Sequence, residues 1–280
     1  TGFKGYWRSD VAVARRPEWY ASIKMSSNRT IGCELVNQDN MLGLHQGDGV
    51  LLHCQSGLEY DDIQPVWDWN RLPGTTCDQG LKSLTPGGSK RGPTSTSSFV
   101  GVLGDAENGV AAMAYHRASL SAKKAWFIFD DRIVCLGAGI RGESLRSVYT
   151  SVEQRWSGSK ALSSAGALTT GATSIKANHW VHHQGVGYRM MTAATVSMQN
   201  VKGNWKMVFP TWPWGEAAGD VFSIWIDHGK SPQDATYAYT IFPNIAEDMM
   251  DSTAAATILS NTESVQAVTL NGDLSAVFHA

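Results

Sequence analysis

The segment Ser223-Ile224-Trp225-Ile226-Asp227 alternates polar and apolar side chains. This period of two is typical of a β-strand that has one face in a core and the other face outside it. Comparable runs recur along the chain at 19–25, 30–36, 50–54, 110–115, 125–129, 133–136, 147–152, 180–191, 221–226 and 236–242. The pattern predicts a protein that is built almost entirely from strands.

Turn residues separate these runs, as in Gly47-Asp48-Gly49, Pro73-Gly74 and Asn271-Gly272. Helices are predicted at only two segments, 245–250 and 252–259, with a turn or two each. The composition of 80–98 predicts a long exposed loop, and 157–177 is also loop-like but has a possible strand at 167–175. We therefore expect an all-β protein, a large antiparallel β-sandwich with few short helices.

Composition excludes some functions. The chain has 280 residues, a net charge of -2 and scattered lysine and arginine, which argues against a nucleic-acid-binding protein. No apolar run approaches the roughly 20 residues of a membrane helix. A polyanionic ligand stays possible, because a local basic cleft can exist on a nearly neutral protein.

The four cysteines show no C-x-x-C pair, so a structural zinc site is not expected. Cys33 and Cys54 are almost symmetrical about Gly43 and would face each other if the flanking segments formed a hairpin. Either a disulfide joins them, as in an oxidising compartment, or all four cysteines are buried free thiols.

Two short motifs favour structural interpretations. The segment Gly137-Ala138-Gly139-Ile140-Arg141-Gly142 matches a dinucleotide fingerprint, but it leads into strand-like residues instead of a helix, so we interpret its glycines as turn residues. On a strand, His182 and His183 point to opposite faces and cannot converge with His179 on one metal ion without a bulge.

Eleven tryptophans are a high number for this length. An indole can fill a core or stack on the C–H face of a sugar ring. We expect Trp205, Trp212 and Trp214 to lie in an ordered loop, either in a core or in contact with a sugar.

The most polar turn of the chain begins at Glu34-Leu35-Val36-Asn37 and continues through Asn40, Gly43 and His45 to Gly49. Its carboxylate, amides and imidazole could bind a sugar or could simply hydrogen-bond one another. The motif Arg71-Leu72-Pro73-Gly74-Thr75-Thr76 follows downstream, after Trp67.

These segments resemble polysaccharide lyase family eight, the hyaluronate, chondroitin AC and xanthan lyase type. That family carries N-x-E-N, then G-[WY]-[HY]-x-x-[GD]-G, Y-x-D, a tryptophan and R-L-P-G-T-T. The matching positions run from Asn37 to Gly49, then through Tyr60, Trp67 and Arg71–Thr76. Further similar segments at 15–19, 25–29, 122–127, 135–140, 152–155, 226–229 and 237–239 extend the resemblance over nearly the whole chain.

The resemblance implies a galactose-mutarotase-like supersandwich that spans 1–280 as the central domain of a longer lyase. An N-terminal α/α toroid and a C-terminal β domain of the family have no matching segment in this chain. It also implies a secreted, extracellular enzyme that acts as a monomer on an acidic polysaccharide, with the toroid as its partner within the same protein. We expect no cofactor, although aspartates and asparagines in the loops leave calcium open.

The implied reaction is β-elimination beside a uronic acid. The family's catalytic Asn, His, Tyr and Arg belong to the toroid, so neither His45 nor Tyr60 is a substitute for them. By resemblance, Glu34 orients the catalytic arginine and Asn37 contacts the substrate. Asn40, His45, Asn28 and Arg29 are further candidate substrate-binding residues.

Two positions depart from the family pattern: Asp39 replaces a glutamate, and Leu44 replaces an aromatic residue that could stack on a sugar. Hyaluronan, chondroitin, xanthan and alginate all stay open as substrates. The alternative function is a non-catalytic carbohydrate-binding β-sandwich protein, which the abundance of tryptophan and the missing catalytic residues would both suit.

Overall fold

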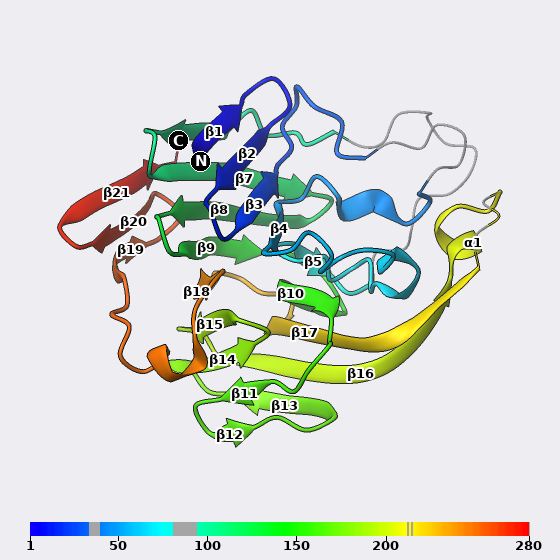
Figure 1. The fold of residues 1–280 in the computed structure, drawn as a ribbon. Coiled ribbons are helices and arrows are strands. Elements are labelled where there is room, and N and C mark those ends of the chain that lie inside the picture. Colours follow the sequence, from blue (N-terminus) through cyan, green and yellow to red (C-terminus); the bar gives the residue numbers. More distant parts are fainter. Residues whose placement is uncertain (34–39, 81–93, 212, 214, 280) are drawn as a thin grey trace.

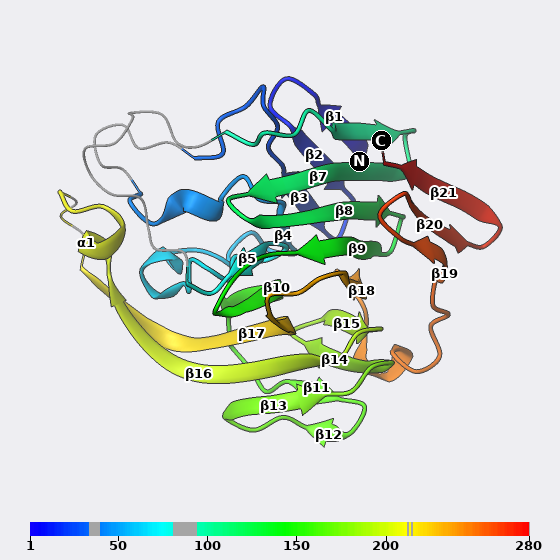
Figure 2. The same ribbon diagram turned by 180° about the vertical axis from the view of Figure 1, so that it is seen from behind.

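A computed structural model describes residues 1–33, 40–80, 94–211, 213 and 215–279. Over these residues the chain forms four sheets, whose paired strands run antiparallel (Figures 1 and 2). Helical structure in the same residues is limited to α1 (Trp205–Val208) and the short 3₁₀ helices η2 (Gly43–His45), η3 (Gln64–Val66) and η4 (Glu247–Met249). The predicted all-β class with few short helices is confirmed.

The four sheets differ in size and in how far their neighbouring strands are separated along the chain. From one edge to the other, the four-stranded sheet contains β1 (Gly2–Tyr6), β2 (Val11–Arg15), β3 (Tyr20–Lys24) and β4 (Val50–Cys54). The five-stranded sheet contains, in spatial order, β13 (Gly171–Ile175), β16 (Ala194–Asn204), β17 (Glu216–Lys230), β10 (Ser147–Trp156) and β5 (Thr76–Asp78). The nine-stranded sheet contains, in spatial order, β12 (Gly166–Ala167), β11 (Leu162–Ser163), β14 (His179–His183), β15 (Val186–Met190), β18 (Ala235–Phe242), β9 (Ile133–Arg141), β8 (Leu120–Ile128), β7 (Gly109–Arg117) and β6 (Val100–Gly104). The three-stranded sheet contains β19 (Thr257–Asn261), β20 (Val265–Leu270) and β21 (Asp273–Phe278).

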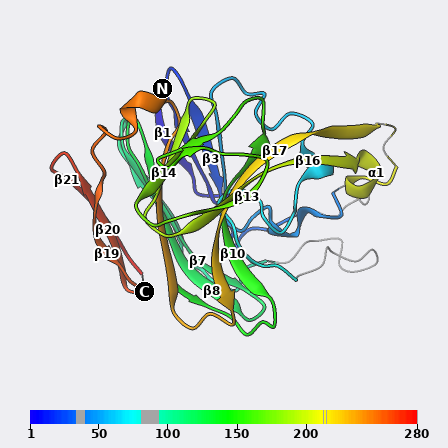
Figure 3. The ribbon, with the colours of Figure 1, turned by 90° about the horizontal axis from the view of Figure 1, so that it is seen from below.

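The nine-stranded sheet is the middle layer, and its central strands β8 and β9 are buried on both faces. Trp126 on β8 packs in a large core with Ile23 of β3 and Phe222 of β17. The next residue, Phe127, points to the opposite face and packs in a second core with Val268 of β20. Figure 3 shows the sheet of β19, β20 and β21 as a separate outer layer. A strand that is buried on both faces reads as a continuous apolar run, which is why β8 and β9 show little alternation.

Most of the predicted strands are present, and 50–54 coincides with β4. The run 180–191 divides into β14 and β15 at Gln184-Gly185, where both residues have positive φ. The predicted helix at 252–259 is wrong, because residues from Thr257 onward form β19 and Ile258 packs in the second core. Residues 245–250 contain only η4. The expected strand at 30–36 does not begin in the described residues 30–33, and most of the expected loop at 80–98 lies outside the described residues.

The proposed Cys33–Cys54 disulfide is wrong: all four cysteines are free. Strand β3 ends at Lys24, so a long connection separates it from β4 and the two strands do not form a tight hairpin. Cys54 lies opposite Tyr20, at the far end of that strand pair from the connection that holds Cys33.

The glycine-rich motif leads into no helix, as expected, but the interpretation of its glycines as turn residues is wrong, because residues 137–141 lie inside β9. A side chain at Gly137 would collide with the ring of Tyr237 on the neighbouring strand. These glycines allow strands to pack closely and do not open a helix. A search of the described helices finds none long and apolar enough to cross a membrane.

The β16–β17 hairpin projects beyond the body of the sandwich and carries α1 at its tip (Figures 1 and 3). The side chain of Asn204 caps α1 by accepting a hydrogen bond of 2.9 Å from the backbone N–H of Lys206. This projecting hairpin brings α1 to the end of the molecule where the β3–β4 connection also lies.

Candidate functional site

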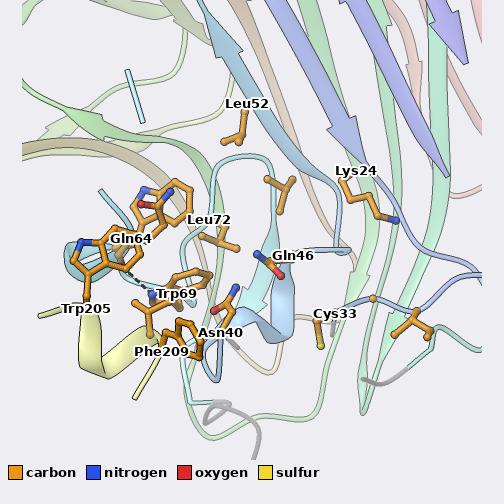
Figure 4. A pocket seen from close by; sticks show the side chains of 15 residues that line it. Lys24, Cys33, Asn40, Gln46, Leu52, Gln64, Trp69, Leu72, Trp205 and Phe209 are labelled. Carbon is orange, nitrogen blue, oxygen red and sulfur yellow. Dashed lines mark hydrogen bonds between the residues drawn. The ribbon is translucent and has the colours of Figure 1, made fainter. Parts of the chain in front are cut away.

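A hollow of about 980 Å³ opens between α1, the segment 64–72 and the β3–β4 connection (Figure 4). Its lining is mostly apolar and aromatic, with a few amide side chains. The lining residues include Cys33, Asn40, Gln46, Leu52, Gln64, Trp67, Trp69, Leu72, Trp205 and Phe209.

Aromatic side chains gather in one part of this hollow. Trp67 and Trp69 pack edge to face with their ring centroids 5.5 Å apart, and Trp69 Nε1 donates a hydrogen bond of 3.1 Å to the carbonyl oxygen of Gln64. Trp205 and Phe209 line it from α1 and the residue that follows (Figure 4). Indole faces held in this way can stack on sugar rings.

Two amide oxygens in the hollow lack a donor. Asn40 Oδ1 and Gln64 Oε1 are buried and accept no hydrogen bond from the described residues. Asn40 has a positive φ of 54°, a conformation that asparagine tolerates better than most residues. Its neighbour Met41 is tied to the projecting hairpin by a backbone hydrogen bond of 3.1 Å to Val208. Because buried acceptors are normally satisfied, these two oxygens suit the hydroxyl or amide donors of a ligand.

A buried ionic cluster lies behind the hollow and holds the end of the β3–β4 connection. The Asp48 carboxylate pairs with the Arg117 guanidinium at 2.5 and 2.7 Å and accepts a hydrogen bond of 2.7 Å from Nδ1 of His45. Burial alone would raise the pKa of Asp48, but the hydrogen bond from His45 and the charge of Arg117 outweigh burial and lower it. Asp48 therefore stays ionised inside the protein.

His45 does not contact the hollow in the way that we predicted for a substrate-binding residue. The side chain is buried, and His45 Nε2 forms a hydrogen bond of 3.0 Å with Sγ of Cys77, whose pKa is raised by burial. With both ring nitrogens bonded to protein groups, His45 supports the turn and offers no free nitrogen to a sugar. Whether His45 has a structural role or binds a substrate depends only on the direction of its side chain, and tertiary packing determines that direction.

Among the predicted binding residues that the structure describes, only Asn40 lines the hollow. Asn28 is exposed and lies outside the lining. Arg29 pairs with the buried carboxylate of Asp10 at 2.8 Å, so its charge already has a partner. Glu34 and Asn37 lie outside the described residues, but Cys33 and Asn40, which flank that segment, both line the hollow.

A second buried cluster joins β4, β10 and β15. The Glu153 carboxylate pairs with Arg155 at 2.7 Å and with His53 at 2.8 Å, and it accepts hydrogen bonds of 2.8 Å from the hydroxyls of Tyr60 and Tyr188. Burial raises the pKa of Tyr60 well above its usual value, so its proton is held firmly. Tyr60 is therefore a structural residue and a poor general base, in agreement with the expectation that it does not replace a catalytic tyrosine.

The sequence did not reveal Gln64, Trp69 and Phe209 as lining residues. Trp69 lies beside the recognised motif, but nothing in the sequence indicates that segment 64–72 faces α1. The structure also keeps His182 and His183 on different sides of β14, with His182 bonded to the carbonyl oxygen of Ile245 and His183 stacked on Phe222. Within the described residues, no group of three or more metal-binding side chains is found.

Comparison with known proteins identifies the family of the chain. Residues 1–254 match the super-sandwich domain of polysaccharide lyase family 8, and the chain belongs to this family. It is 36% identical to chondroitinase-AC of Pedobacter heparinus, over 94% of this chain and 39% of that protein. It is 30% identical to hyaluronate lyase HylB of Enterococcus faecalis, over 96% of this chain and 29% of that protein.

Solved structures agree with the sequence comparison. A chondroitinase AC lyase superimposes with a TM-score of 0.94 at 33% identity, over 99% of this chain and 42% of the other. A Paenibacillus xanthan lyase superimposes with a TM-score of 0.91 at 27% identity, over 99% of this chain and 29% of the other. The chain thus spans about two fifths or less of the length of these relatives.

Proposed function

We propose that this chain is the central domain of a secreted lyase that cleaves a uronic-acid-containing polysaccharide by β-elimination. In this proposal the 980 Å³ hollow forms part of one wall of the substrate cleft. The observation that carries the proposal is the pair of unsatisfied amide oxygens, on Asn40 and Gln64, beside the indoles of a hollow in a member of a lyase family. A wall of this kind can contact a sugar chain by stacking and by hydrogen bonds.

The reaction removes the weakly acidic proton α to the uronate carboxylate and expels the glycosidic oxygen from the neighbouring carbon. Negative charge that develops on the carboxylate must be neutralised by fixed donors. The family resemblance assigns this role, and that of the base, to residues of an α/α toroid. The part left to this chain is positioning: Glu34 orients the catalytic arginine, Asn37 contacts the substrate, and Asn40 binds a sugar hydroxyl.

The test measures the ultraviolet absorbance of unsaturated uronate with hyaluronan, chondroitin, xanthan and alginate. The chain is assayed alone and joined to any upstream α/α toroid that its gene encodes. We expect cleavage only in the joined form, and we expect the variants Asn37→Ala and Asn40→Ala to lower kcat/KM by roughly tenfold or more, the effect of one lost hydrogen bond that tightens in the transition state. Lys176→Ala, at an exposed position outside the hollow, is the control and should change kcat/KM little.

The same experiment distinguishes the alternative function, a carbohydrate-binding protein, from the proposed lyase. If the joined form cleaves none of the four polymers but the chain still binds one of them, the protein is a carbohydrate-binding module, which the indoles of Trp67, Trp69 and Trp205 would also suit. Turnover by the chain alone at the rate of a whole enzyme would contradict the proposed division of labour between two domains.

A further inference from the structure

Segment 64–72 separates two hollows. Gln64, Trp67, Trp69 and Leu72 face the hollow described above, whereas Val66, Asp68 and Arg71 line a second hollow of about 180 Å³. The floor of this second hollow is the outer face of the five-stranded sheet, on β10, β16 and β17. A hollow of this volume can hold one sugar unit of a polysaccharide chain.

The floor presents polar groups that have no partner. Ser151 on β10 and Ser223 on β17 both line the hollow, and neither hydroxyl has a hydrogen-bond partner among the described residues. Ser151 is only 1% exposed, and its side chain lies at the floor of the hollow. The amide of Gln199 on β16 lines the same space. Unpaired hydroxyls and an amide in one concave site are what a polyhydroxylated ligand needs.

The wall of the hollow is held rigidly. The Arg71 guanidinium lies 4.7 Å from the ring centroid of Trp225 and donates a hydrogen bond of 2.7 Å to Asp68. The side chain of Gln154 accepts from the backbone N–H of Asp68 at 2.8 Å and donates to the carbonyl oxygens of Asp68 and Arg71. Such preorganisation lowers the entropy cost of binding.

The charges indicate an uncharged ligand. Arg71 is the one lysine or arginine in the described lining, and Asp68 neutralises it. Glu153 also lines the hollow, and its charge is balanced inside the protein by Arg155. A carboxylate or sulfate placed in this hollow would meet Asp68 without a free cation to compensate, whereas sugar hydroxyls can use Ser151, Ser223 and Gln199 at no electrostatic cost.

We infer that this second hollow binds a neutral pyranose unit of a polysaccharide. Its hydroxyls hydrogen-bond to Ser151, Ser223 and Gln199, and its C–H groups pack on Val201 and Trp225. The inference deepens the proposed function, on which it rests for the presence of a polysaccharide. The second hollow lies on the other side of segment 64–72 from the first hollow. It binds an uncharged sugar unit of the same polysaccharide chain or of a neighbouring one.

The experiment is ligand-observed NMR on the 280-residue chain with N-acetylglucosamine, N-acetylgalactosamine and mannose as neutral probes and glucuronate as the charged probe. We expect at least one neutral sugar to bind in a salt-independent way and glucuronate to bind more weakly. Removing two hydrogen-bonding groups in the double variant Gln199→Ala/Ser223→Ala should raise the Kd about tenfold or more. The control is Asn200→Ala, next to Gln199 on β16 and outside the lining.

Three results would overturn the inference: no neutral sugar binds, glucuronate binds more tightly and is displaced by salt, or the double variant binds as well as the parent. If the double variant has a lowered Tm, the single variant Gln199→Ala, at an exposed position, replaces it. Cleavage of polymer by the toroid-joined form, measured in parallel, tests the proposed function separately. Intact cleavage without sugar binding in this hollow would reject only the second contact.

Discussion

His183 is a buried imidazole that the fold keeps neutral. It stacks on Phe222 with ring centroids 4.1 Å apart, and its Nδ1 has no hydrogen-bond partner among the described residues. Burial, with a smaller contribution from the charge of Arg155, lowers the pKa of His183 from 6.5 to about 4. The folded protein therefore binds this proton only below about pH 4, whereas the unfolded chain binds it near pH 6.5.

This difference predicts that the free energy of unfolding falls on acidification from pH 6.5 toward pH 4. In that window the unfolded chain holds one more proton at this position, so stability rises with pH by up to about 1.4 kcal/mol per pH unit. Urea unfolding at a series of pH values measures the slope. The variant His183→Phe keeps the stacking on Phe222 but cannot bind the proton. It should therefore lower the slope by the contribution of about one proton, up to about 1.4 kcal/mol per pH unit.

The exposed Leu145 provides the control for this measurement. Leu145→Phe should leave the slope between pH 4 and pH 6.5 unchanged, because it changes no titratable group. An unchanged slope in His183→Phe would contradict the argument. His228, whose pKa burial also lowers to about 4, contributes a parallel slope that persists in both variants.

Asn40 and His45 show how much a single side chain's direction matters. Both come from the same polar turn, and the residue types alone made both of them candidate ligand contacts. Asn40 lines the hollow with an unpaired oxygen, but His45 turns inward to Asp48 and Cys77. The hydrogen-bond partners of His45 come from residues 48 and 77, so the second partner is set by β5 and not by the local sequence.

At the level of elements, the projecting β16–β17 hairpin is fixed to the body by a close contact with η3. Gly203 on β16 lies so close to the carbonyl oxygen of Pro65 that an added Cβ would overlap it. The contact has a functional consequence in our proposal, since residues of both η3 and α1 line the first hollow. Glycine at 203 is therefore required by proximity and not by a turn.

We expect Gly203→Ala to lower the free energy of unfolding by about 1–3 kcal/mol, the usual cost of forcing an extra methyl group into a packed contact. Thermal unfolding followed by circular dichroism gives the change in Tm. Gly101→Ala on β6 is the matched control, because a Cβ there would meet no atom within 4 Å. Equal Tm values for the two variants would show that η3 can move away without cost.

At the level of the whole molecule, two cores on opposite faces of the nine-stranded sheet stabilise the chain without covalent cross-links. The free thiols of Cys77 and Cys135 are completely buried, and burial raises the pKa of Cys135 to about 12. A thiol with so high a pKa is almost entirely protonated at neutral pH and is a poor nucleophile. Stability must come from apolar burial, because no disulfide joins any of the four cysteines.

This arrangement predicts that a reductant leaves the Tm of the purified chain unchanged. A thiol titration in denaturant should detect all four cysteines per chain, with or without prior reduction. Under native conditions Cys77 and Cys135 should react far more slowly than in denaturant. If only two thiols were detected before reduction, the result would contradict the structure and support a Cys33–Cys54 disulfide.

The sequence by itself determined the class, the family and most of the strands, since alternation, turn residues and ordered motifs are local signals. It misplaced the segment 252–259, where residues from Thr257 form an edge strand that pairs with β20 and whose burial depends on the second core. Only the tertiary structure decided which polar residues face a hollow. Gln64, Trp69 and Phe209 meet there because η3 and the projecting hairpin pack together, and the pair Ser151 and Ser223 forms a floor because β10 and β17 are neighbours. Contacts between segments far apart in the chain leave no periodic signal in the sequence, so only the packed structure shows them.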